Sequence, residues 1–386
     1  MTGTFTALET PGSMAVAPWS RLPGVMLGVL AAAMLALLAG VAAADAPGCP
    51  ADGADEWVET GVIRIGYRPN APPFSFRKAA PAPGDDPDDP WRCVGGYSIE
   101  LCKRVVSTIR EKLDAPCAKQ PVRAELVPVA VFSPSAEAAQ GDGDIAGCGP
   151  LPPQVERFAA LDPGTPRDQG IDMLCGATSM TVDRMLDFDY SLITYITGAA
   201  FLYAQGTPFA TLGDLVAPAG EPPDARPIGV LRGGSAQYVL EQLVTDAGLD
   251  RSRIDIDELG DYADVVPRLL EADDGGSLFA FFGDKEILLA LVARAAEAAP
   301  DVAQRLVLSG STFSYEPYAL AFRRDNRLLR FYANTALVSL FGSEDDLGAL
   351  LRKSFPGRKV VGEKLRTLFE IQRIPQGRGR PLVPGG

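Results

Sequence analysis

The chain has 386 residues, of which 47% are hydrophobic and 22% are charged, which is typical of globular protein and sufficient for two domains. Its net charge is −13, and this acidic balance argues against nucleic-acid binding because phosphate contacts require clustered lysine and arginine. The complete lack of histidine excludes the catalytic triads and zinc sites that use it. The six cysteines include no CxxC pair, so we expect neither a metal site nor another cofactor.

The first 44 residues are expected to form a signal peptide. Arg21 precedes an almost wholly apolar run, 22–44, which ends in three alanines. This order of charge, apolar run and small residues predicts export with cleavage before Asp45, and therefore a periplasmic location. The run is also long enough to span a bilayer, so a retained N-terminal anchor stays open.

All the cysteines lie in the first half of the chain, and an even number in an exported protein predicts disulfide bonds. They are Cys49, Cys93, Cys102, Cys117, Cys148 and Cys175. If 98–113 is a helix, a Cys102–Cys117 bond is disfavoured. Cys102 would lie roughly 17 Å from the helix end, and four more residues could hardly return the chain to within about 6 Å. The other pairings stay open.

The mature chain opens with a predicted strand and a ligand-facing or solvated loop. Residues 62–67 alternate as a strand does, and 68–76 contain prolines without apolar periodicity, which indicates a loop. Arg68 stands directly after the strand. From the residues alone, it is either a solvated loop arginine or a ligand contact.

The next stretch combines surface segments with one helix and one strand. Segment 79–90 contains proline, aspartate and glycine without an apolar pattern, and we expect a surface excursion. Apolar spacing predicts a helix over 98–113, and 125–131 is the second predicted strand. The stretch 133–156, which contains Cys148, is expected to be a surface insert held by a disulfide, or alternatively an element that docks a partner.

The segment 175–184, with the sequence CGATSMTVDR, has the pattern of a carboxylate-binding loop. A short apolar run ends at Gly176, where the lack of a side chain permits close approach of a ligand. Thr178 and Ser179 offer hydroxyl groups, and the guanidinium of Arg184 matches a carboxylate with two parallel hydrogen bonds. The alternative is a capped helix whose arginine pairs with a neighbouring aspartate.

The 175–184 loop, the opening segment 62–76 and the Gly-Tyr turn before 98–113 resemble periplasmic amino-acid-binding proteins, the bacterial extracellular solute-binding protein family 3. The resemblance is closest to the glutamate/aspartate-binding branch, which has a Cys-Gly, hydroxyl-rich loop of this length. It implies that Arg184 binds the α-carboxylate of an amino acid. It also implies that Arg68 binds a side-chain carboxylate, since an arginine at that position does so in the glutamate/aspartate branch. Many binders of neutral or basic amino acids carry an acidic residue near there instead.

The second half of the chain predicts further strands that end at polar residues. Strand 199–204 is interpreted as the first crossing between two lobes. Strand 227–231 is followed by two glycines and Ser235 and then by a helix, an arrangement that favours an anion at the helix N-terminus. In the family, this turn contributes backbone N–H groups and a hydroxyl from the second lobe to the ligand carboxylate.

Strand 278–284 places Asp284 at its carboxyl end, where ligands bind in open α/β sheets. The family uses an aspartate here, or nearby polar groups, to hold the ligand ammonium. The alternative is a cap for a helix over 285–298, and one residue can do both. Segment 309–318 is interpreted as the return crossing, and helices over 325–372 complete the first lobe.

Two positions depart from the family pattern. Ala71 stands where an aromatic residue often covers the ligand, and Tyr262 stands near a position where some binders of acidic amino acids have histidine. Both departures could widen the site or change its preference. With these departures in view, an acidic amino acid is the first expectation for the ligand, and a polar amino acid is the second.

These elements indicate an α/β protein, and the resemblance implies the two-lobed, type II-like fold of periplasmic binding proteins, with a discontinuous first lobe and two hinge crossings. The expected boundaries are 45–204 and 312–375 for the first lobe, 205–311 for the second and 376–386 for a flexible tail.

The resemblance implies a periplasmic protein that captures an amino acid and delivers it to the membrane subunits of an ABC importer. We expect a monomer without enzymatic activity and therefore without catalytic residues. Two alternatives stay open. The same fold hosts secreted dehydratases of cyclic acids, and related proteins act as accessory or sensor binding proteins without transport.

Overall fold

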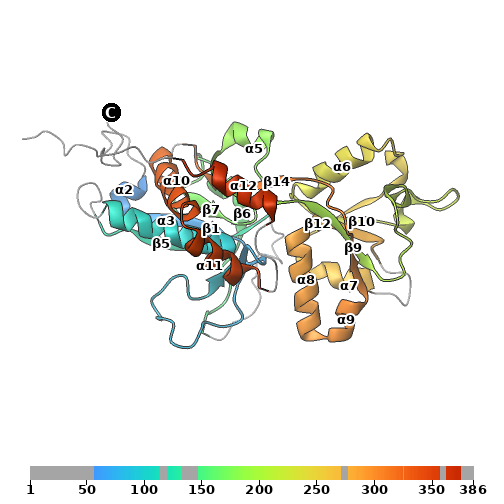
Figure 1. The fold of residues 1–386 in the computed structure, drawn as a ribbon, viewed down its shortest axis with the longest axis horizontal. Coiled ribbons are helices and arrows are strands. Elements are labelled where there is room, and N and C mark those ends of the chain that lie inside the picture. The colour runs from blue at the N-terminus through green and yellow to red at the C-terminus, as the bar shows by residue number, and fades with distance from the viewer. Residues whose placement is uncertain are drawn as a thin grey trace, which may run out of the picture. The chain divides into compact units, whose positions relative to one another are not determined.

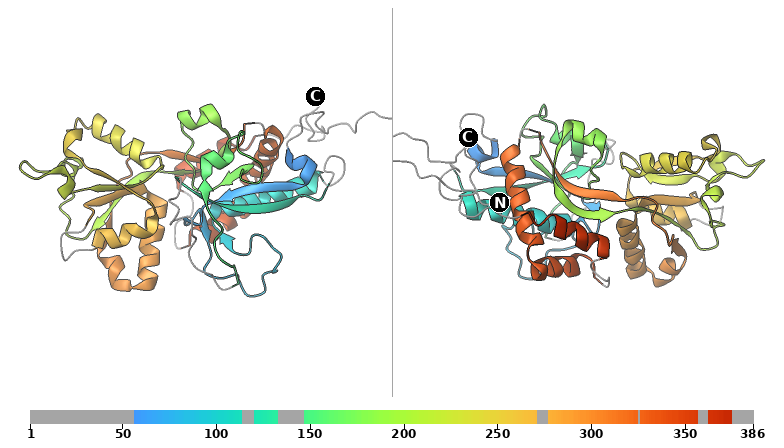
Figure 2. Two further views of the ribbon diagram at one scale, coloured as in Figure 1. Left: turned by 180° about the vertical axis from the view of Figure 1, so that it is seen from behind. Right: turned by 45° about the horizontal axis from the view of Figure 1, so that its top comes forward.

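The protein is described by a computed structural model over residues 56–113, 120–132, 147–270, 277–324, 326–356 and 362–374. The predicted signal peptide and tail lie outside the described residues. Within them, the chain forms two α/β lobes, each built on its own mixed sheet (Figure 1). The predicted fold class is therefore confirmed. Segments from both ends of the described chain share the first lobe, while the yellow and orange middle segment forms the second (Figure 2).

The first lobe has a six-stranded sheet. In spatial order its strands are β6 (Val155–Glu156), β5 (Arg123–Ala130), β1 (Val62–Tyr67), β7 (Met173–Cys175), β14 (Glu316–Phe322) and β8 (Asp189–Thr197). The first four strands are parallel, and β14 is antiparallel to β7 and β8. A small antiparallel sheet accompanies it, formed by β2 (Asn70–Ala71), β3 (Ser75–Arg77) and β4 (Val94–Gly95).

Helices accompany this sheet, and most of them pack one apolar face on the core. They are α2 (Glu56–Thr60), α3 (Tyr97–Leu113), α4 (Arg157–Leu161), α5 (Val182–Asp187), α10 (Arg327–Phe341), α11 (Glu344–Ser354) and α12 (Glu363–Ile371). Helix α5 is the exception, because none of its residues is buried. Ile99, Val105 and Ile109 recur at helical spacing on α3 and are fully buried. They share a core with Leu329 and Ala333 of α10, so the two ends of the described chain stabilise one lobe.

Among the described residues, two disulfides join parts of the first lobe, while Cys49 and Cys117 lie outside the described residues. Cys102 of α3 pairs with Cys175 at the end of β7, which agrees with the argument against a bond from Cys102 to Cys117. Both cysteines are fully buried. The bond thus fixes the start of the 175–184 loop to the lobe's first long helix.

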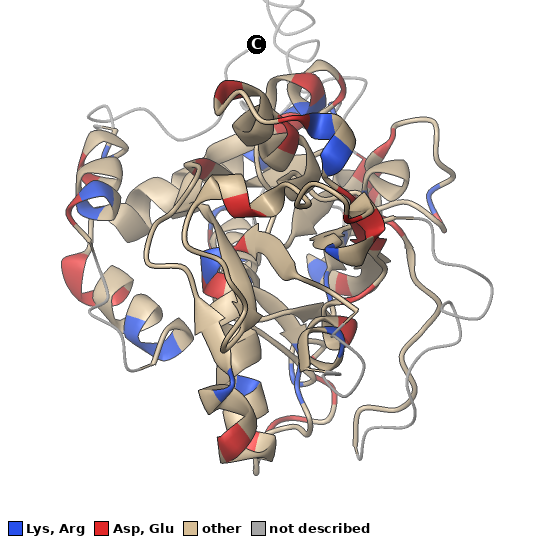
Figure 3. Ribbon diagram, turned by 90° about the vertical axis from the view of Figure 1, so that its right-hand side faces the viewer, with Lys and Arg blue, Asp and Glu red and all other residues tan. Residues whose placement is uncertain are grey.

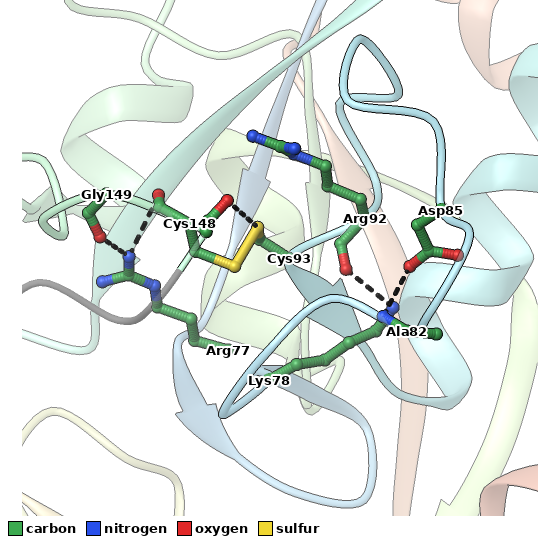
Figure 4. Close-up of a disulfide and its surroundings, with 9 residues drawn as sticks. Arg77, Lys78, Ala82, Asp85, Arg92, Cys93, Cys148 and Gly149 are labelled. Atoms are coloured by element: carbon green, nitrogen blue, oxygen red, sulfur yellow. Dashed lines mark hydrogen bonds between the residues drawn. A yellow bond between two sulfur atoms is a disulfide. The ribbon is translucent and has the colours of Figure 1, made fainter.

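The second disulfide joins Cys93, which follows the surface excursion 79–90, to Cys148 of the insert (Figure 4). Arg77 donates to the backbone carbonyls of Cys148 and Gly149 beside it. The expected disulfide in the insert is confirmed. The insert is not wholly a surface element, however, because its last two residues form β6 and pair with β5 at the edge of the sheet.

The second lobe is a five-stranded sheet with helices packed on it. Its strands in spatial order are β11 (Ile256–Leu259), β10 (Ile228–Leu231), β12 (Ala280–Asp284), β9 (Ala199–Ala204) and β13 (Leu306–Leu308), and its helices are α6 (Ala236–Asp246), α7 (Val265–Leu270), α8 (Lys285–Ala298) and α9 (Pro300–Gln304). Phe201 of β9 packs on Phe282 of β12 with ring centroids 4.6 Å apart. Within the described residues, no helix has the length and hydrophobicity that a membrane crossing requires.

The chain passes from one sheet to the other twice, and the two connecting segments, called passages here, meet at Gly198. The strand 199–204, which we expected to be the first crossing, is instead β9 of the second sheet, so the first passage falls at Gly198 between β8 and β9. The return passage runs from β13 to β14, through residues that contact Gly198. A Cβ atom at Gly198 would lie 2.2 Å from the Ser314 carbonyl oxygen and 2.2 Å from Thr312 Cγ2.

We therefore expect Gly198→Ala to force the two passages apart and to destabilise the protein by about 1–3 kcal/mol, as overpacking does. The matched control is Gly310→Ala, because a Cβ there meets no atom within 4 Å. Chemical denaturation of both variants checks the prediction. Equal stability of the two variants would contradict the close contact between the passages.

Candidate functional site

The sheet topology gathers the predicted site residues at the carboxyl ends of parallel strands. Arg68 follows β1, the 175–184 loop follows β7, Ser235 follows β10 and Asp284 ends β12. In open α/β sheets, ligands bind at these carboxyl ends of the strands, and this end of the sheets is called the edge here. Because β14 is antiparallel to β7, its first residue, Glu316, lies at this same edge.

Three arginines lie near one another at this edge. Arg157 and Arg184 both stack over the ring of Phe158, at 4.7 and 4.8 Å from its centroid. Their Nη2 atoms donate to the Gly233 carbonyl of the second lobe, at 3.3 and 3.5 Å. Arg68 is close enough for its charge, together with that of Arg184, to act on Arg157. Arg68 and Arg184 thus both lie close to Arg157, a residue that was not singled out from the sequence.

The three guanidinium groups form no ion pair with any carboxylate among the described residues. Arg68 and Arg157 are only 3% and 2% exposed, and the Nε atom of each has no hydrogen-bond partner in the described structure. Burial and the charges of the other two arginines lower the pKa of Arg157 to about 9. Burial also lowers the pKa of Arg184. A bound anion would relieve this repulsion.

The loop 175–184 has the geometry expected of a ligand-facing turn. Gly176 lies against the Arg68 side chain: a Cβ atom there would be 3.5 Å from Arg68 Cγ and Cδ, which is an ordinary van der Waals contact. Thr178 is fully buried, and its hydroxyl has no hydrogen-bond partner in the described structure. Arg184 Nη1 donates to the Ser179 carbonyl at 2.8 Å, which fixes the guanidinium beside the loop. The alternative in which Arg184 pairs with a neighbouring aspartate is not observed.

Ser179 and Ser235 come together from the two lobes, but around an internal carboxylate. Their Oγ atoms are 3.0 Å apart. Both donate to Oε2 of Glu316, at 2.7 Å from Ser179 and 2.5 Å from Ser235, and Ser314 donates to Oε1 at 3.2 Å. Glu316 is 6% exposed. The serine hydroxyls that we expected to face a ligand carboxylate therefore hold a carboxylate of the protein.

Asp284 stands beside Glu316 and is half-buried. Desolvation and then the negative charge of Glu316 raise the pKa of Asp284 to about 7, although the hydroxyl of Tyr318 partly opposes this rise. Asp284 occupies the N-cap position of α8, as the alternative interpretation expected, but its side chain makes no capping hydrogen bond to the helix. The site therefore has a cationic side with three arginines and an anionic side with two carboxylates.

Tyr262 and Asn70 line the Arg68 end of the site. The Arg68 guanidinium lies over the Tyr262 ring at 5.5 Å, and its Nη2 donates to Asn70 Oδ1 at 3.4 Å. Asn70 in turn donates to Asp261 of the second lobe. A cavity of about 560 Å³ borders Asn70, Asp261 and Tyr262. Neither the three arginines nor Asp284 and Glu316 line it, so it adjoins the arginine cluster and does not contain it.

Arg157 and Glu316 were not singled out from the sequence. One feature could have pointed to a functional role for Arg157. It begins α4, and a basic residue at the positive end of a helix is electrostatically unfavourable. Glu316 lies in the return crossing and immediately precedes the apolar run of β14. Its role depends on the meeting of both lobes, which no local pattern reports.

Comparison with known proteins found a relative that is similar to this chain over most of its length. The chain is 25% identical over 297 residues to the glutamate/aspartate import solute-binding protein of Escherichia coli strain K12, and the match covers 76% of each chain. The chain is a homologue of import solute-binding proteins. No family model matches it.

Solved structures agree on the fold. An ancestral arginine-binding protein bound to glutamine matches with a TM-score of 0.50 and 20% identity, covering 76% of this chain and 98% of that one. An ancestral amino acid-binding protein, described as a precursor of cyclohexadienyl dehydratase, matches with a TM-score of 0.50 and 18% identity, covering 78% and 98%. Both likenesses show the two-lobed fold of amino-acid-binding proteins.

The raised pKa of Asp284 predicts a pH-dependent cost of folding. Its pKa rises from an ordinary 3.8 to about 7 in the folded protein, so the folded state binds more protons than the unfolded state between these values. Stability should therefore fall as the pH rises through this window. We expect Asp284→Asn to unfold about 2–4 °C above wild type at pH 8, and close to wild type at pH 5, where Asp284 is already neutral.

Differential scanning calorimetry of the two proteins measures this difference. Asp224→Asn is the control, because Asp224 is exposed and lies on the surface of the second lobe. A stabilisation by Asp284→Asn that is equal at both pH values would contradict the assigned origin of the effect.

Proposed function

We propose that this protein captures an acidic amino acid, glutamate or aspartate, in the periplasm and delivers it to the membrane subunits of an ABC importer. The observation that carries the proposal is the unpaired charge of the site. Three guanidinium groups have no ion-pair partner among the described residues, and two carboxylates, Asp284 and Glu316, are close enough for their charges to act on Arg184. A ligand with two carboxylates and one ammonium matches both sides.

Charge favours an acidic ligand over a neutral or basic one. A buried arginine is costly unless a carboxylate compensates it. A neutral amino acid such as glutamine brings one carboxylate, whereas glutamate brings two, and a basic ligand would add positive charge to the arginine cluster. We assign the α-carboxylate to Arg184 and the side-chain carboxylate to Arg68, with Arg157 between them. Gly176 and Thr178 are assigned to the ligand-facing turn.

The relatives and the sequence support the biological setting. The E. coli relative is an import solute-binding protein, and the apolar segment 22–44 supports export. Positions of lysine and arginine are interspersed with those of aspartate and glutamate along the ribbon in Figure 3. We propose that the protein acts as a monomeric binder, with the boundaries predicted above except that the second lobe begins at β9.

A second function, dehydration of a cyclic carboxylic acid, is favoured by one observation. The pKa of Asp284 near 7 would suit a general acid at neutral pH. Incubation with candidate cyclic acids, followed by chromatography of the mixture, separates the two functions. A binder leaves each acid intact, and catalytic consumption of one of them would favour the enzyme.

The assignment of Arg184 predicts the effect of its removal. Loss of one partner of a desolvated, hydrogen-bonded charge pair costs on the order of 2–5 kcal/mol. Arg184→Ala should therefore weaken glutamate binding by about 30-fold or more in calorimetric titration. Arg104→Ala is the control, because Arg104 forms a surface ion pair with Asp346. An Arg184→Ala protein that binds within a few-fold of wild type would refute the assignment.

The assignment of Arg68 predicts a change of preference. The wild type should bind glutamate about tenfold or more tightly than glutamine, since glutamine leaves Arg68 without a carboxylate. Arg68→Ala should remove most of that difference while the protein still binds amino acids through Arg184. Competitive titration with both ligands measures the ratio. Equal wild-type affinities would rule out an acidic ligand and leave only general amino-acid binding.

A further inference from the structure

The hydroxyl protons of Ser179 and Ser235 are both used within the protein. A serine hydroxyl has one proton to donate and two lone pairs that accept. Both hydroxyls contact Glu316 Oε2, at 2.7 and 2.5 Å, and they contact each other at 3.0 Å. Whichever hydroxyl donates within this triangle, no proton remains for a ligand carboxylate. The free lone pairs can only accept.

The neighbours of this triangle are also acceptors. Asp284 lies beside it because Asp284 pairs with Ala199 and Glu316 pairs with Thr197, on either side of Gly198. The Ser314 hydroxyl accepts from the Ala199 amide at 2.9 Å and donates to Glu316 Oε1 at 3.2 Å, so its proton is also used. Three serine hydroxyls from three segments thus orient one buried carboxylate next to a second one.

We propose that Glu316 is a specificity-determining residue that turns Ser179 and Ser235 into acceptors and, with Asp284, builds a subsite for the ligand ammonium group. This inference rests on the proposed capture of an acidic amino acid and corrects the expected role of the two serines. The four residues Ser179, Ser235, Asp284 and Glu316 are called the acidic corner here. Dicarboxylates without an amino group fit the arginines but bring no hydrogen-bond donor to this corner. Glu316 therefore makes the protein select amino dicarboxylates over plain dicarboxylates.

Several charged and titratable groups surround this corner. From the first lobe, Arg68 and Arg184 act on its carboxylates, and Tyr318 stands on the same strand as Glu316. From the second lobe, Glu286 of α8 adds negative charge near Asp284, and Tyr262 lies near Tyr318. The cations are those assigned to the ligand carboxylates, which leaves the ligand ammonium as the partner of the two acids.

The test compares L-glutamate with glutarate, which has the same chain and both carboxylates but no amino group. Calorimetric titration of wild type should show tight binding of glutamate and much weaker binding of glutarate. Glu316→Gln keeps the size of the side chain and an acceptor oxygen but removes the charge. It should weaken glutamate by about 10- to 100-fold and leave glutarate within a few-fold. Glu344→Gln, an exposed glutamate on α11, is the control and should change neither affinity.

Ser235→Ala provides a second variant at the less buried edge of the corner. If the serine accepts from the ammonium, this variant weakens glutamate and leaves glutarate unchanged; if it donates to a carboxylate, both ligands weaken. An equal loss for both ligands in Glu316→Gln and in Ser235→Ala overturns the inference while the proposed function stands. A wild type that binds glutarate as tightly as glutamate also overturns it. A wild type that binds no amino acid overturns both.

Discussion

Buried charge without an internal partner is the constraint on which the rest of this structure depends. Arg68 and Arg157 are almost wholly buried, and among the described residues neither they nor Arg184 meet a carboxylate. Removing a guanidinium from water costs several kcal/mol unless an anion compensates it. The fold tolerates this cost by stacking two of the guanidinium groups on Phe158 and by directing their N–H groups to backbone carbonyls. Such an arrangement is unfavourable for folding alone and favourable for holding an anion.

The second half of the site follows from how the chain passes between the lobes. Gly198 permits the two passages to touch, and this contact places the start of β14 beside the end of β12. Gly233 has a positive φ of 71°, and a Cβ atom there would lie 2.6 Å from the Val131 carbonyl oxygen. Its own carbonyl accepts from Arg157 and Arg184. Contacts across the lobes are therefore made by arginines that we propose to face the ligand, an arrangement that suits hinge closure around a ligand.

Much of the fold could be predicted from local patterns. Strand 62–67, helix 98–113 and helix 285–298 follow from their alternation or helical spacing, and the structure confirms them. The first passage was misplaced because strand 199–204 is apolar throughout, and apolarity does not report which sheet a strand joins. The edge strand β6 is only two residues long, too short to give any periodic signal.

The site was predictable where the chemistry lies within one segment. Arg68, Arg184 and Asp284 each stand at a strand end or in a polar turn, so their position could be argued from the sequence. The role of the serines could not, because it depends on Glu316, which is 137 residues from Ser179 and 81 from Ser235. A hydroxyl is both donor and acceptor, and only its tertiary partner decides which function remains for a ligand.

The most direct measurement is a crystal structure of the protein with L-glutamate. The account predicts both ligand carboxylates within hydrogen-bonding distance of the cluster formed by Arg68, Arg157 and Arg184, and the ammonium within that distance of Asp284 and Glu316. A ligand bound in the reverse orientation, with a carboxylate against Ser179 and Ser235 and its ammonium toward the arginines, would contradict it. So would a ligand that binds elsewhere and leaves the arginines without an anion.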